Sequence, residues 1–169
     1  MAEDIRKLED QYDANERDAR LLVNDLSEKL GTWHADAGSW SVAECLDHLA
    51  TTNRIYLETM RVPATQALNS KRRGARRASP GLVGRLICYS LEPPVKSRSK
   101  GKAPAIIRPR MAVPLADAFS AFTSSQAELR AFVREYADID FSGVMFPNPF
   151  IKWLRLSLAS ATSPSAGRM

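Results

Sequence analysis

Apolar residues recur every three or four positions over the first thirty residues of the chain. The positions between them are mostly Lys, Arg, Asp, Glu and Gln. This spacing predicts one amphipathic helix over residues 3–30, which Gly31 is suited to end. Its stripe, with one polar member, comprises Ile5, Leu8, Tyr12, Asn15, Ala19, Leu22 and Leu26.

A second helix is predicted from Val42 to about Ser70. Ser41 is a suitable N-cap, and Glu44 three residues later completes a capping box with it. We expect Pro63 to kink this helix or to end it early. The apolar stripe comprises Val42, Cys45, Leu46, Leu49, Asn53, Tyr56 and Met60.

Two more helices are predicted in the last third of the chain. The third follows Pro114, a residue suited to a first helical turn, and reaches Tyr136 with Leu115, Phe122 and Leu129 on its stripe. The fourth covers Phe150–Ala161. It is apolar on most sides, because Ile151, Leu154 and Leu158 share one face while Trp153 and Leu156 lie elsewhere, so we expect it to be central. No strand alternation is convincing, and residues 163–169 are expected to be a disordered tail.

The lengths of the connections predict how these helices run. About ten residues join the first two helices, which should therefore be antiparallel. Residues 71–112 form a long connection, in which Leu82–Leu91 could make a short helix, and this length allows the second and third helices to be parallel. The fold class expected is all-α: one four-helix bundle over residues 1–162, with a long crossover between helices 2 and 3 and a short last helix.

Charge is unevenly distributed along the chain. Residues 71–110 hold 12 of the 24 basic residues and one acidic residue, giving +11, whereas the remainder carries 12 basic and 18 acidic residues, giving −6. Such a segment is typical of proteins that meet nucleic acid or anionic lipid. Tyr89 is its one aromatic residue, which argues against recognition of single strands by stacking. We therefore expect a solvated connection and no nucleic-acid partner.

Composition points to one water-soluble domain. The 169 residues are 44% hydrophobic and 25% charged. No apolar run approaches the roughly 20 residues of a membrane span, and the charged start is unlike a secretory signal. We expect a cytoplasmic protein without a membrane partner. The two cysteines, Cys45 and Cys88, have neither zinc-knuckle nor CxxC spacing, and we expect both to be buried structural thiols.

Residues 38–49, with the sequence GSWSVAECLDHL, resemble the second-helix signature of the DinB-like superfamily. There a Trp-Ser pair precedes a helix of the form V-A-E-x-L-x-H-L. Residues 91–96 with 102–104 are similar to the long connection in one branch of that family, and residues 146–150 resemble the entry to its last helix. The resemblance covers most of residues 5 to 158.

The resemblance implies an up-down-down-up four-helix bundle, which agrees with the connection lengths. It also implies a divalent metal such as nickel, zinc or iron, commonly held in the family by three histidines. One of these corresponds to His48, and the other two lie four apart on the last helix, beyond the position of Leu158. This chain departs from that pattern, because its histidines are His34 and His48 and none follows residue 48. We expect the last helix to have lost its second half.

Several kinds of chemistry around His48 stay open. Glu44 lies four residues away on one helical face, and Asp117 or Glu128 is a candidate third ligand. Cys45 is close enough to His48 for a Cys–His pair, although no orienting third group is evident. His34 is expected to be a solvated loop histidine.

Two functions remain. The first is a DinB-like domain with a degenerate metal site and no catalysis. The alternative is a metal-dependent hydrolase or thiol transferase with an unknown small-molecule substrate, whose site is completed by carboxylates or by a second chain. We expect a homodimer, because a short last helix leaves apolar surface on the other three.

Overall fold

The computed structural model describes residues 2–36, 38–70, 103–151 and 153–162. Within these ranges the chain is mostly helical. Predictions that fall on residues 71–102 and 163–169 lie outside the described residues; these include the Leu82–Leu91 helix, Cys88, most of the basic segment and the tail. The elements in order are α1 (Ala2–Asn24), α2 (Glu28–Gly31), α3 (Val42–Asn69), a 3-10 turn η1 (Ala105–Ile107), α5 (Leu115–Glu135), β1 (Met145–Pro147), β2 (Arg155–Ser157) and α6 (Leu158–Thr162).

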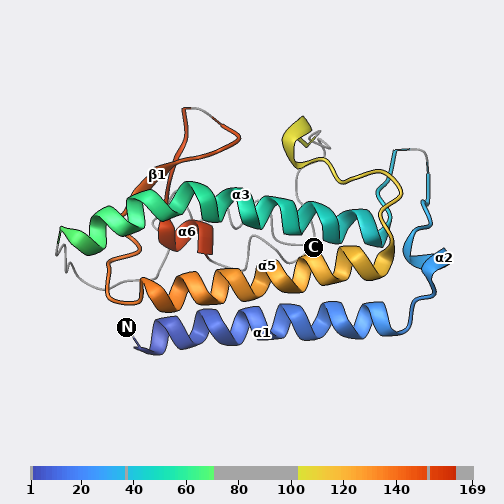
Figure 1. Cartoon of the computed structure of the whole chain (residues 1–169), viewed down its shortest axis with the longest axis horizontal. Coiled ribbons are helices and arrows are strands. Elements are labelled where there is room, and N and C mark those ends of the chain that lie inside the picture. The colour runs from blue at the N-terminus through green and yellow to red at the C-terminus, as the bar shows by residue number, and fades with distance from the viewer. Residues whose placement is uncertain (1, 37, 71–102, 152, 163–169) are drawn as a thin grey trace.

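Three long helices lie side by side, with α5 packed against both α1 and α3 (Figure 1). The figure shows α1 running opposite to α3, whereas α3 and α5 run the same way. These directions agree with those predicted from the connection lengths. In the described part of the chain, no helix is both long enough and apolar enough to cross a bilayer.

The predicted helix over residues 3–30 is divided in two. The first part ends at Asn24, and Ser27 starts the second by accepting a hydrogen bond from the amide of Leu30. The second part ends at Gly31, as predicted. A Cβ on Gly31 would lie 2.4 Å from a methyl group of Leu115, so glycine allows this turn to pack closely on α5.

The second helix begins at Val42 and ends at Asn69, close to the predicted bounds. Ser41 and Glu44 form both bonds of the predicted capping box. The expectation that Pro63 ends the helix early is wrong, because α3 continues through it for six more residues. The third helix starts after Pro114 and buries the predicted stripe residues Leu115, Phe122 and Leu129.

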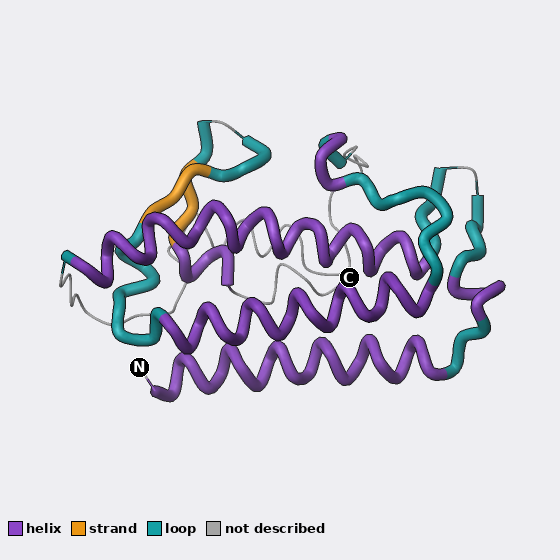
Figure 2. Tube along the Cα trace, in the orientation of Figure 1, coloured by secondary structure: helices purple, strands orange, loops and turns teal. Residues whose placement is uncertain are grey.

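The predicted fourth helix over Phe150–Ala161 is wrong. Its place is taken by a two-stranded antiparallel hairpin, in which Phe146 pairs with Leu156, followed by the five-residue helix α6 (Figure 2). Asn148 favours the turn over a helix, since its side-chain oxygen accepts the amides of Phe150 and Ile151. Among the described residues, the fold is therefore a bundle of three long helices completed by a hairpin and a short last helix.

The main core lies where α6 and the hairpin meet the first half of α1 and the second half of α3. It contains Leu8 and Tyr12 of α1, Met60 of α3, Phe132 of α5 and Leu158 of α6. A second cluster gathers around Leu46, Leu115 and Phe122 at the other end of the bundle. The region around His48 belongs to this second end.

Candidate functional site

His48 lies in the second turn of α3 and contacts the far end of the long connection. Its Nδ1 is 2.5 Å from the carbonyl oxygen of Ile107, a buried residue of η1. Because a carbonyl can only accept, Nδ1 carries the proton, and in the neutral ring Nε2 then holds the lone pair. The ring also packs on Trp40, with centroids 4.8 Å apart.

Asp47, the residue before His48, binds the same segment. Its carboxylate accepts the backbone amide of Arg110 at 2.8 Å and the guanidinium Nε and Nη2 at 2.9 and 2.7 Å. Burial alone would raise the pKa of Asp47, but the hydrogen bonds and the charge of Arg110 outweigh it, so the pKa lies below its usual value. The contacts of Asp47 and His48 together, here called the α3 anchor, hold residues 107–110 against the helix.

Sequence reasoning missed the Asp47–Arg110 pair. Arg110 is one of the 12 basic residues of the segment 71–110, and nothing local distinguishes it from the others. The two residues lie 63 positions apart. No local spacing signals such a pair.

Glu44 performs the capping role expected of it and also binds His34. Its Oε2 accepts the backbone amide of Ser41 at 3.0 Å and the Nε2 of His34 at 2.8 Å. His34 is in the loop before α3, as predicted, and its side chain is 47% exposed. The expectation of a merely solvated histidine is incomplete, because the ring lies in contact with the buried carboxylate.

The described residues near His48 do not fit a divalent metal. A tight zinc site needs three or four nitrogen, sulfur or oxygen ligands. Glu44 is committed to the helix cap and His34, and Asp47 to Arg110. Glu128 accepts from Ser124 and lies 3.7 Å from Arg54. Nowhere in the described ranges do three His, Cys, Asp or Glu side chains come together as a metal site requires.

Cys45 is half-buried on the same face of α3 as Leu49. Burial, and then the charge of Glu44, raise the pKa of its thiol. A raised pKa disfavours the thiolate that a nucleophile needs. Cys45 is therefore not buried as expected, and its raised pKa argues against a catalytic Cys–His pair.

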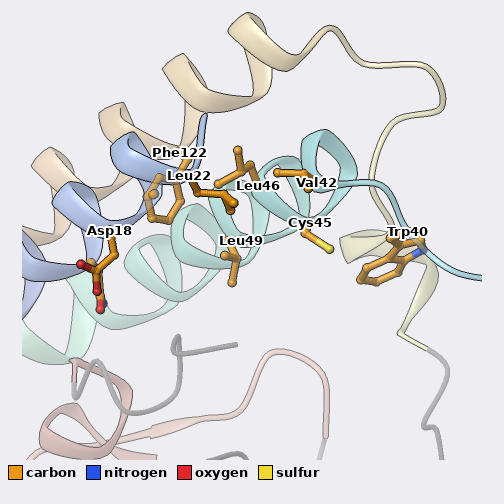
Figure 3. A pocket seen from close by; sticks show the side chains of 10 residues that line it. Asp18, Leu22, Trp40, Val42, Cys45, Leu46, Leu49 and Phe122 are labelled. Carbon is orange, nitrogen blue, oxygen red and sulfur yellow. The ribbon is translucent and has the colours of Figure 1, made fainter. Parts of the chain in front are cut away.

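An apolar groove of about 360 Å³ opens between α1 and α3 (Figure 3), and Trp40, which packs on His48, is part of its lining. Asn15, Asp18, Ala19 and Leu22 line it from α1 at helical spacing, facing Cys45 and Leu49 of α3. Phe122 of α5 lies behind them, and the Trp40 ring is at one end. We call this feature the α1–α3 groove. Several of its residues belong to the stripes that the sequence pattern assigned to the core.

Comparison with known protein families identifies the superfamily of this chain. A family model described as the DinB superfamily matches residues 11–161. No curated protein and no solved structure matches the chain. The matched range includes most of α1, all of α3 and α5, the hairpin and nearly all of α6. The chain therefore belongs to the DinB superfamily.

Proposed function

We propose that this chain is a non-catalytic binding domain of the DinB superfamily, in which His48 anchors the long connection instead of holding a metal. The observation that carries the proposal is the bond from the His48 ring to the carbonyl of Ile107. Asp47 beside it is bound to Arg110, and Glu44 one turn earlier is bound to Ser41 and His34. Glu44 and Asp47, the two carboxylates nearest to His48 on this helix, thus both have structural partners.

The metal-dependent alternative has one observation in its favour. Metal-bound histidines usually donate their second ring N–H to a carbonyl or carboxylate, which fixes the ring. The bond to Ile107 is of that kind and leaves Nε2 free to act as a ligand. A hydrolase or thiol transferase would then need its other ligands from carboxylates or from a second chain.

Metal content separates the two functions. Protein purified without a histidine tag is analysed for nickel, zinc and iron by mass spectrometry, as wild type, His48→Ala and the control His34→Ala. We expect far less than one metal per chain in all three. Stoichiometric metal that is lost in His48→Ala but kept in His34→Ala would overturn the proposal.

A second readout tests the anchoring role directly. Without the imidazole, the carbonyl of Ile107 loses its hydrogen bond, so amides of residues 105–112 should exchange with deuterium faster in His48→Ala than in wild type. His34→Ala should leave that exchange unchanged. Equal exchange in His48→Ala and wild type would contradict the anchoring role. The expected homodimer and cytoplasmic location stay predictions.

A further inference from the structure

The apolar stripe of α1 is covered along the first half of the helix and exposed along the second half. Leu8 and Tyr12 are 6% and 3% exposed beneath α6, whereas Leu22 is 52% exposed. The hydroxyl of Tyr12 donates to the carbonyl of Thr162, the last residue of α6. Asn15, the first groove residue, comes one turn after Tyr12. Among the described residues, α6 thus covers this stripe as far as the α1–α3 groove.

The groove has the size of a small-molecule pocket, with a volume of about 360 Å³. Trp40 bounds one end (Figure 3), and α6 terminates near the other. Small-molecule pockets in proteins usually have volumes of about 300–1,000 Å³, apolar walls and a few polar groups.

The polar groups of the groove are unevenly placed. Leu22, Leu49 and Phe122 make the middle apolar, and Cys45 adds a thiol whose raised pKa keeps it neutral. Asp18 is the one charged side chain among the described residues of the lining, and Asn15, three residues earlier on α1, adds a side-chain amide. Within the described residues, the Asp18 carboxylate forms no ion pair or hydrogen bond. The lining therefore offers a negative charge at one end and hydrocarbon toward the other.

We propose that the α1–α3 groove binds an elongated small molecule with an apolar body and a protonated amino group. The ammonium pairs with Asp18 and the side-chain oxygen of Asn15. The apolar body lies along Leu22 and Leu49 toward Trp40. This inference rests on the proposed function, because it names the class of ligand that the proposed binding domain would bind. His48 is not part of the groove lining, so a metal at His48 and an amine in the groove are tested separately.

The test compares three probes of equal chain length, octylamine, octanol and octanoate, each below its micelle concentration, by titration calorimetry. Octylamine should bind best. An exposed ion pair contributes up to about 1 kcal/mol, so Asp18→Asn should weaken octylamine about fivefold and leave octanol unchanged. The matched control Asp10→Asn, an exposed acid elsewhere on α1, should change neither. High salt should reduce the preference for the amine.

A filling variant locates the binding. Ala19→Trp places an indole in the groove and should abolish octylamine binding, with folding checked by circular dichroism. In wild type, of the three indole N–H signals in NMR spectra, that of Trp40 should shift on titration. No octylamine binding, equal binding of all three probes, or octylamine binding unaffected by Ala19→Trp would overturn the proposal. A dimer in sedimentation that Ala19→Trp dissociates would also overturn it, since a second copy would then cover the groove.

Discussion

At the scale of single residues, the buried carboxylate of Asp47 shows how a charge is kept inside the protein. Its side chain is 4% exposed, whereas that of Arg110 is 65% exposed, so solvent screens one partner of the pair. Three hydrogen bonds from Arg110 compensate the cost of burial. Since such bonds stabilise only the ionised form, the pair links stability to pH.

We predict that Asp47→Asn lowers the free energy of unfolding at pH 7 by about 1–2 kcal/mol, after allowing for the exposure of Arg110. The folded-state pKa of Asp47 is depressed. Its contribution is therefore complete above the unfolded-state pKa near 3.9 and is lost as pH falls through the lower folded-state value. Urea unfolding of wild type and variant should thus converge at low pH. Asp10→Asn is the control, and a pH-independent difference would contradict this linkage.

Gln126 presents the opposite case, a buried polar atom without a partner. The residue is 5% exposed on the stripe of α5, and its Oε1 has no hydrogen bond among the described residues. An unsatisfied buried acceptor costs about 1–3 kcal/mol. Gln126→Met keeps the length of the side chain and removes the acceptor, so we predict a rise of about 1 kcal/mol in the free energy of unfolding. Destabilisation on urea unfolding would mean that Oε1 is hydrogen-bonded in solution.

At the scale of elements, the sequence predicts the helices that carry local signals. The start of α3 was predictable because Ser41 and Glu44 lie three residues apart, and α5 because Pro114 precedes an uninterrupted stripe. The break after Asn24 was missed, since the apolar spacing continues to Leu26 while Ser27 begins a new helix. Helical periodicity alone does not reveal where a chain restarts.

The hairpin shows how two periodicities can compete in one segment. Ile151, Leu154 and Leu158 fit a helix, but Leu154, Leu156 and Leu158 also alternate as in a strand. The strand forms because Asn148 stabilises the turn and Leu156 becomes buried opposite Phe146, and Leu158 then begins α6. At the candidate site, His48 was found through a family signature, but its contact with Ile107 joins residues 59 positions apart and no sequence pattern predicts it.

At the scale of the whole molecule, five-residue α6 takes part in the main core with all three long helices. Leu158 is fully buried and packs in one cluster with Tyr12 of α1, Met60 of α3 and Phe132 of α5. The tip of the hairpin, in contrast, leaves the Trp153 side chain 83% exposed. A central helix over the same residues would have buried both side chains, so the two arrangements make different predictions about stability.

We predict that Leu158→Ala lowers the free energy of unfolding by about 2–5 kcal/mol, because a fully buried leucine leaves a cavity among three helices. Trp153→Ala removes a larger side chain but should change the free energy of unfolding by no more than about 0.5 kcal/mol, as substitutions of exposed residues usually do. Urea unfolding of the two variants beside wild type provides the comparison. If Trp153→Ala were as unstable as Leu158→Ala, the fourth helix predicted from the sequence would be correct and the Trp153 indole would lie in the core. The larger effect at the smaller residue would instead confirm that α6 and the hairpin complete the bundle.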